Sequence, residues 1–220
     1  MCGRFSLTQS AEIIAQTFQL LEVPPNSPRY NIAPTQPVAT IRQNPGRQFQ
    51  WMRWGLIPSW AKDLSIGNKL INARAETLTE KPSFRHAFKQ RRCLIIADGF
   101  YEWQQVDNRK QPYYFQMKDG TPFAFAGLWE TWHSPQGEEI ISCTIITTDA
   151  NAIAKPIHAR MPVILPSDSY DRWLDSTVTD FQILQRLLHP YDSEAMKTIA
   201  VSRAVNNPEN DTPECIQSLQ

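Results

Sequence analysis

Short apolar runs recur along this chain, and they limit the folds open to it more than any other feature. They are rich in β-branched and aromatic residues, and turn-forming stretches such as 44–47 (NPGR) and 118–122 (KDGTP) separate them. The runs are residues 38–42, 48–54, 92–97, 113–117, 123–129, 141–148 and 161–165. Neighbouring runs follow one another as in meanders, so we predict an α+β fold with a curved, largely antiparallel, barrel-like sheet.

Helices are predicted at the periphery of this sheet. Thr8 or Ser10 can cap a helix whose apolar residues Ile14, Phe18 and Leu21 repeat at helical spacing. Further helical segments are predicted near residues 83–90, 149–154, 167–174 and 180–189. The proline-rich residues 23–37 are expected to form an ordered loop over the surface, because proline interrupts regular structure.

Length and composition favour one domain spanning residues 1–220. The chain is 41% hydrophobic, enough for one sizeable core. Lysine plus arginine equals aspartate plus glutamate at 22 each, so any polyanion would have to be bound by a local patch of charge. The chain starts without a basic and apolar leader, and no stretch approaches membrane-spanning length. We expect a cytoplasmic monomer that does not contact a membrane.

The cysteines single out one position. All four are far apart in the sequence, without the close pairs that zinc ligation favours, so we expect neither a metal nor a cofactor. Cys93 and Cys143 lie in apolar segments, as small buried hydrophobic residues do, and Cys215 lies in a polar one. Cys2, which follows Met1 directly, is either a structural cysteine or a reactive centre.

Candidate site residues gather in four short segments at predicted strand ends or in loops, where function is commonly carried. They are Cys2, Arg4, Trp54, Trp60, Asn72, Arg74, Glu102, Thr147, His158 and Arg160. Each has an ordinary structural interpretation when taken alone: the polar groups as turn, strand or ion-pair residues, and the tryptophans as core. Only their joint occurrence favours a functional site.

Six motifs taken together resemble the SRAP family, the SOS-response-associated peptidases or abasic-site processing proteins. In chain order they are MCGRF, RWGLIPSW, NARAET, DGFYEW, IHARMP and VSRAVNNPEND, and they extend from Cys2 to about Asp211. The resemblance implies a β-rich α+β domain with a basic groove that ends at the N-terminal cysteine. It also implies that the protein recognises abasic sites in single-stranded DNA and crosslinks itself to them through that cysteine.

Cys2 has the functional groups that such a crosslink needs. A ring-opened abasic site exposes an aldehyde, which an amine attacks to give an imine. Once Met1 is removed, Cys2 carries an α-amine and a thiol on adjacent carbons, so the thiol can close onto the imine carbon as a thiazolidine. An internal cysteine cannot do this, because its nitrogen is an amide. Gly3 would let the sugar approach the backbone closely.

The remaining candidates receive roles that this reaction leaves open. Glu102 is the proposed general acid and base, with a pKa raised by its apolar neighbours. His158 would deliver or accept a proton when the hydroxyl group leaves the carbinolamine, and it could also contact a phosphate. Asn72 would hold the amine or a sugar hydroxyl by hydrogen bonding. The expected DNA contacts are phosphate binding by Arg4, Arg74, Arg160 and Thr147 and base stacking by Trp54 and Trp60.

Two other functions stay open at this point. Cys2 as a thiolate, with His158 as base and Asn72 as orienting group, would suit a cysteine peptidase, of which removal of Met1 is a limited version. Alternatively, the chain is a non-covalent single-strand binding module in which Cys2 takes no part. The sequence also leaves open whether strand cleavage by elimination, a lyase activity, accompanies crosslinking.

Overall fold

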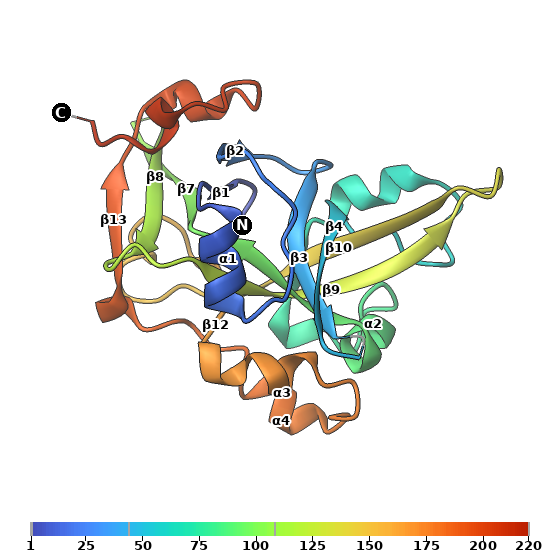
Figure 1. Ribbon diagram of the computed structural model, residues 1–220. Coiled ribbons are helices and arrows are strands. Elements are labelled where there is room, and N and C mark those ends of the chain that lie inside the picture. The colour runs from blue at the N-terminus through green and yellow to red at the C-terminus, as the bar shows by residue number, and fades with distance from the viewer. Residues whose placement is uncertain (1, 44, 108, 220) are drawn as a thin grey trace.

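Two β-sheets organise the chain (Figure 1). The computed structural model describes residues 2–43, 45–107 and 109–219. Met1, whose removal the proposed chemistry requires, and Asn44, the first residue of a predicted turn, lie outside the described residues. The first sheet has the strand order β13-β8-β7-β1-β2. Its strands are β1 (Phe5–Leu7), β2 (Arg29–Ile32), β7 (Gly99–Val106), β8 (Arg109–Met117) and β13 (Met196–Ala200).

The second sheet closes on itself. Pairing runs from β10 through β4, β3, β6 and β9 and returns from β9 to β10. These strands are β3 (Pro37–Gln43), β4 (Arg47–Trp54), β6 (Arg92–Ala97), β9 (Phe123–His133) and β10 (Glu139–Asp149). The shorter strands β5 (Asn72–Arg74), β11 (Arg160–Pro162) and β12 (Ile164–Leu165) extend it. Its pairings are antiparallel except those of β10 with β4 and β5, which confirms the predicted β-rich, barrel-like α+β fold.

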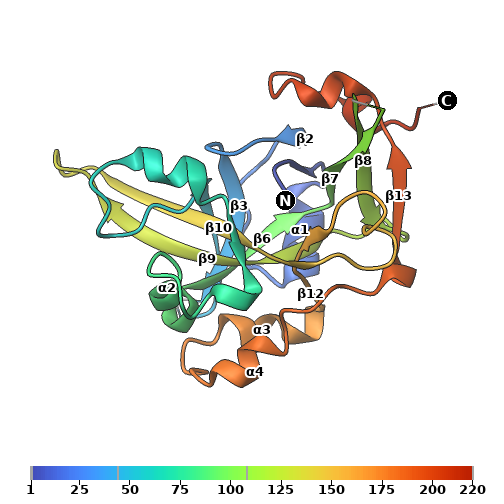
Figure 2. The ribbon, with the colours of Figure 1, turned by 180° about the vertical axis from the view of Figure 1, so that it is seen from behind.

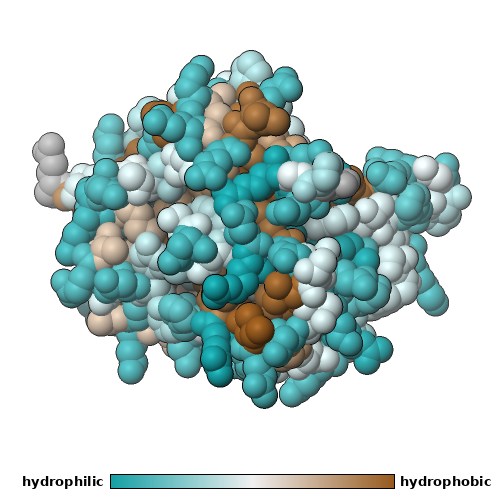
Figure 3. Space-filling view, turned by 60° about the horizontal axis from the view of Figure 1, so that its bottom comes forward, coloured by the Kyte–Doolittle hydropathy of each residue, from teal (hydrophilic) through white to brown (hydrophobic). Residues whose placement is uncertain are grey.

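The central strand β6 is buried along its whole length because both of its faces are covered. Helices α2 (Arg85–Gln90), α3 (Tyr170–Leu174) and α4 (Phe181–Gln185) lie at one end of the molecule (Figure 2). Trp173 Nε1 on α3 donates to the Cys93 carbonyl oxygen at 2.9 Å, and Arg92 donates to five carbonyl oxygens around these helices. The outer face at this end is mostly polar, with separate small apolar patches (Figure 3).

The helix α1 (Ala11–Phe18) is confirmed, with a shorter extent than its apolar spacing predicted. Ser10 is the N-cap, and Ile14 and Phe18 face the core. The helix ends at Gln19 in the left-handed conformation, so Leu21 falls beyond it and is fully exposed. Short 3-10 segments occupy Leu64–Lys69, Ala75–Thr77, Ser167–Ser169, Ser193–Ala195, Arg203–Asn206 and Pro213–Ile216.

Two predicted segments differ from the structure. Residues 149–154 form the end of β10 and a series of turns instead of a helix. Pairing with β11 keeps Asp149 extended, and Asn151 Oδ1 accepts from the backbone N–H of Ala154 at 3.1 Å, which stabilises the turn. The proline-rich loop contains the strand β2, because the residues between Pro28 and Pro34 keep their N–H groups and find a partner in β1.

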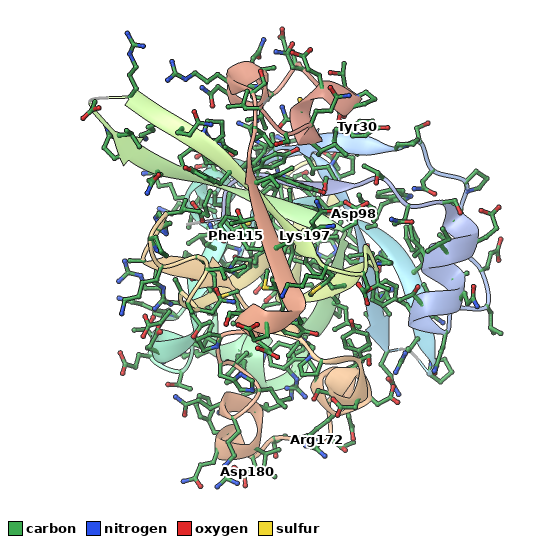
Figure 4. All side chains as sticks on the ribbon, turned by 90° about the vertical axis from the view of Figure 1, so that its left-hand side faces the viewer. Tyr30, Asp98, Phe115, Arg172, Asp180 and Lys197 are labelled. Atoms are coloured by element: carbon green, nitrogen blue, oxygen red, sulfur yellow. The ribbon has the colours of Figure 1, made fainter. Side chains whose placement is uncertain are left out.

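One edge of the first sheet is formed by β13, which carries Lys197 (Figure 4). Phe115 on β8 lies behind it, and Tyr30 lies at the opposite end of the molecule from Arg172 and Asp180. None of the described helices is long and apolar enough to cross a membrane.

Candidate functional site

The strand β1 places Cys2 between the two sheets. Phe5 pairs with Phe100 of β7 on one side and with Ile32 of β2 on the other. Its ring packs edge-on against Trp54 at 5.1 Å between centroids, which ties β1 to the barrel. Cys2, just before this strand, has no exposed surface. The N-terminal segment is therefore part of the folded core.

The register of β1 and β7 brings Glu102 to the N-terminal segment. The backbone N–H of Tyr101 donates to the Arg4 carbonyl oxygen at 3.0 Å, and continuing the Phe5–Phe100 register places Glu102 opposite Gly3. Glu102 is 2% exposed. Burial raises the pKa of Glu102 above its usual value, and the neighbouring imidazole of His158 opposes this rise. The direction agrees with the sequence-based prediction.

Asn72 holds the backbone of Cys2. It lies on β5, which runs parallel to β10, with Asn72 paired to Ile145. Its Nδ2 donates to the Cys2 carbonyl oxygen at 2.8 Å. Its Oδ1 is buried and has no hydrogen-bond partner among the described residues. Asn72 is thus a strand residue bound to the N-terminal segment, and an acceptor atom remains available beside it.

A pocket of about 470 Å³ opens beside the N-terminal segment. It is lined by Gly3, Arg4, Glu102, Trp103, Lys110, His158 and Asn206. His158 Nδ1 lies 3.0 Å from both the backbone nitrogen and the carbonyl oxygen of Arg160, so the backbone of Arg160 fixes the position of the ring. The pocket therefore brings together a buried carboxyl group, an imidazole and two cations.

The thiol of Cys2 is held in its neutral form. Burial raises its pKa, and the nearby carboxylate of Glu102 raises it further. The sulfur lies 3.8 Å from the Arg4 carbonyl oxygen, a weak contact. A buried, neutral thiol is a poor nucleophile on its own, since the thiolate is the reactive form.

The predicted arginines differ in how far they are already engaged. Arg74 is exposed on β5. Arg160 forms a bidentate ion pair with Glu76, with N–O distances of 2.7 and 3.0 Å, and also contacts the Asp149 carboxylate at 2.8 Å. Arg4 Nη1 donates to oxygens of Asn31 and Val205 at 2.8 and 2.7 Å. Arg74 is thus the most accessible of the three, and Arg160 would have to share its guanidinium with carboxylates.

Two of the predicted DNA contacts belong to the interior instead. Trp54 is fully buried, and its Nε1 donates to the Ile71 carbonyl oxygen at 2.9 Å, so no face of the ring is open to a nucleobase. Thr147 is also fully buried, with its hydroxyl donating to the Ala73 carbonyl oxygen at 3.4 Å. The strands around β10 cover both side chains. Trp60 is 59% exposed and keeps its ring accessible.

Sequence reasoning missed Trp103, Lys110 and Asn206 as members of the pocket. Trp103 and Lys110 lie on the paired strands β7 and β8, where Gln105 faces Lys110. Recognising residues 99–117 as one hairpin would have placed Lys110 diagonally across from Trp103, with which it lines the pocket. Asn206 belongs to the VSRAVNNPEND motif, which was assigned no role, and its approach to the pocket depends on tertiary packing.

Fold and site together define a β-rich domain whose N-terminal cysteine is built into the wall between two sheets, next to a polar pocket. The sequence profile described as SOS response associated peptidase (SRAP) matches residues 1–208. The chain belongs to the SRAP family. Among the described residues, no group of three or more histidine, cysteine, aspartate or glutamate side chains could hold a metal ion.

Several relatives carry a functional name. Abasic site processing protein YoqW of Bacillus subtilis is 47% identical over 99% of this chain and all of its own length. Abasic site processing protein HMCES of Xenopus tropicalis is 38% identical over 76% of this chain, which corresponds to 56% of its own length. A crystal structure of a protein from Bacteroides thetaiotaomicron, 28% identical, superposes over the full length of both chains with a TM-score of 0.87.

Proposed function

We propose that this protein recognises abasic sites in single-stranded DNA and becomes covalently attached to them. The attachment is a thiazolidine formed by the α-amine and thiol of Cys2 after removal of Met1, and it protects the lesion. The observation that carries the proposal is the position of Cys2, bound by Asn72 and adjacent to the pocket of Glu102 and His158. Membership of the SRAP family and the names of YoqW and HMCES support the substrate.

The reaction proceeds in two bond-forming steps. The Cys2 α-amine adds to the aldehyde carbon of the ring-opened sugar, and the carbinolamine loses one water to give the imine. The thiol then adds to the same carbon, and its proton ends on the ring nitrogen. The raised pKa of Glu102 suits a group that protonates the sugar ring oxygen and later accepts a proton. His158, which lines the same pocket, would protonate the leaving hydroxyl group.

Asn72 orients the nucleophile in this mechanism. Its Nδ2 fixes the Cys2 carbonyl group, and the buried Oδ1 without a partner among the described residues is suited to accept a hydrogen bond from the α-amine. Because the amide is neutral, it can accept this hydrogen bond without favouring the protonated, unreactive form of the amine as a carboxylate would. Fixing one residue that carries both nucleophiles makes the second step intramolecular.

A local cluster of cations would hold the DNA strand. Arg4 and Lys110 line the pocket, Arg74 lies on β5 two residues after Asn72, and Arg160 is the first residue of β11. Trp103 at the pocket and the exposed Trp60 offer aromatic rings for base stacking. Because the net charge of the chain is zero, binding must depend on this cluster rather than on an overall field.

The cysteine peptidase is less well supported. A peptidase needs a thiolate, and both burial and Glu102 favour the neutral Cys2 thiol. The thiazolidine route does not require a thiolate at the start, because the amine attacks first. Removal of Met1 by the protein itself remains compatible with either route.

The test is a crosslinking assay with single-stranded DNA that contains one abasic site. Wild type is expected to give a band that survives denaturing electrophoresis, with a mass equal to protein plus DNA less one water. Cys2→Ala and a form that retains Met1 should give none, whereas the control Cys215→Ala should react normally. A crosslink that persists in Cys2→Ala contradicts the proposal, and hydrolysis of an unrelated peptide by wild type would favour the peptidase.

A further inference from the structure

One wall of the pocket comes from the C-terminal part of the chain. Asn206 lies at the end of the 3-10 segment Arg203–Asn206 and lines the pocket. Its Oδ1 accepts from Trp103 Nε1 at 2.7 Å, which fixes the edge of that ring. The VSRAVNNPEND motif, residues 201–211, thus reaches the N-terminal segment although the two are far apart in the sequence.

Asn31 on β2 holds this C-terminal segment in place. Its side chain is fully buried, and its Nδ2 lies within hydrogen-bond distance of the carbonyl oxygens of Val205, Asn207 and Asn210 at 3.2, 3.0 and 2.7 Å. In return, the Asp211 carboxylate accepts from the backbone N–H of Asn31 at 2.9 Å. Hydrogen bonds therefore connect β2 and residues 205–211 in both directions, with each segment supplying donors or acceptors to the other.

The same side chain also binds Arg4. Asn31 Oδ1 accepts from Arg4 Nη1 at 2.8 Å, and the second acceptor of Nη1, the Val205 carbonyl oxygen at 2.7 Å, belongs to the segment that Asn31 holds. Arg4 Nε makes no hydrogen bond to any described residue, and the guanidinium carbon lies 6.0 Å from the centroid of the Trp103 ring. Both acceptors that orient the guanidinium thus depend on Asn31, directly or through Val205.

We propose that Asn31 is a positioning residue of the lesion pocket, which aims the Arg4 guanidinium at a phosphate of the bound strand. This inference rests on the proposed function. A long side chain that is already ordered in the free protein loses less conformational entropy on binding DNA, so its phosphate contact contributes more to affinity. Without Asn31, Arg4 keeps its charge and its contact with the Trp103 ring but loses the hydrogen bonds that fix its rotamer.

A double-mutant cycle between positions 31 and 4 tests this coupling. The probe is single-stranded DNA with a tetrahydrofuran site, which lacks the aldehyde and so reports reversible binding. Arg4→Ala should weaken binding about tenfold in the wild-type background and less than about twofold in Asn31→Ala, because coupled residues are non-additive. The matched control, Arg74→Ala, should cost the same factor in both backgrounds. Thermal unfolding checks that each variant is folded.

Asn31→Ser provides a second variant in case Asn31→Ala does not fold. Its shorter side chain keeps a hydroxyl group in the buried site but does not replace the oxygen bound to Arg4 Nη1, so the Arg4→Ala penalty should again fall below about twofold, and a penalty of about tenfold in this background overturns the inference. An Arg4→Ala penalty that is equal in wild type and Asn31→Ala, or absent from wild type, overturns the inference. Failure of wild type to crosslink an authentic abasic site would instead overturn the proposed function, so the two failures are distinct.

Discussion

Glu102 combines burial with a proposed role in proton transfer. If it supplies and removes protons during imine formation, Glu102→Gln should slow crosslinking about 100-fold at saturating DNA, in the range expected for one acid–base group. Affinity for the tetrahydrofuran probe should change little, because glutamine keeps the size and hydrogen-bonding capacity of the side chain. Single-turnover gels would measure the rate. An equal loss of affinity with a normal rate would assign Glu102 to DNA binding instead.

The same substitution should stabilise the fold at neutral pH. The folded state binds the Glu102 proton more tightly than the unfolded state does, since burial raises its pKa. Wild-type stability therefore falls as pH rises from the ordinary glutamate pKa, about 4.3, through the raised value. Glu102→Gln lacks this loss, so its Tm should exceed that of wild type at pH 7.5 and approach it at pH 4. An identical difference at both pH values would contradict the assignment.

Lys110 is a cation of the pocket that sequence motifs did not single out. A phosphate contact from Lys110 predicts that Lys110→Ala weakens binding and reduces the slope of log K against log salt by about 0.7, the value for one contact with a single strand. Lys118→Ala, beyond the other end of β8, should leave the slope unchanged. Fluorescence anisotropy at several salt concentrations measures both. An unchanged slope for Lys110→Ala would place this lysine outside the DNA contact.

At the scale of elements, the packing at the start of β7 requires the backbone of Gly99 to lie close to the Tyr114 side chain of β8. A Cβ on Gly99 would lie 2.1 Å from the Tyr114 ring, and Tyr114 is held by a 2.8 Å hydrogen bond to Ser6. Ser6 in turn donates to Asp98 at 2.5 Å, so the ring cannot move without disrupting β1. This packing sets the β1–β7 register that brings Glu102 to Gly3.

Gly99→Ala should therefore destabilise the protein by about 2–3 kcal/mol, as overpacking does in a buried site. For a chain of this size, that corresponds to a Tm lower by about 4–12 °C. Gly46→Ala is the control, since nothing lies within 4 Å of a Cβ at that position. Thermal unfolding followed by circular dichroism gives both values. Equal Tm values for the two variants would show that Tyr114 gives way easily.

Elements differ in how well the sequence predicts them. The strand β6 follows its apolar run from Arg92 to Ala97, because a fully buried strand leaves a continuous local pattern. The strands β1 and β5 have three residues each, too few for a periodic signal. They are strands because Phe100 and Ile145 pair with them across the fold.

At the scale of the whole molecule, DNA binding must arise from local charge, since the net charge is zero. About four phosphate contacts, from Arg4, Arg74, Lys110 and Arg160, predict a salt slope of about −3 for single-stranded DNA. A much steeper slope would require cations outside this cluster. A slope near zero would mean that stacking, rather than phosphate contact, holds the strand. Titration of the tetrahydrofuran probe against salt measures the value.

The sequence by itself determined which reactive groups the N-terminal segment can provide and the class of fold. A cysteine at position 2 can present an amine and a thiol together, and apolar runs of strand length separated by turn signals specify a β-rich domain, because both properties are local. Only the tertiary structure decided which side chains reach the site. Burial removed Trp54 and Thr147 from the surface, and long-range contacts brought Lys110 and Asn206 to the pocket. Exposure and proximity depend on pairings between distant segments, which no local pattern records.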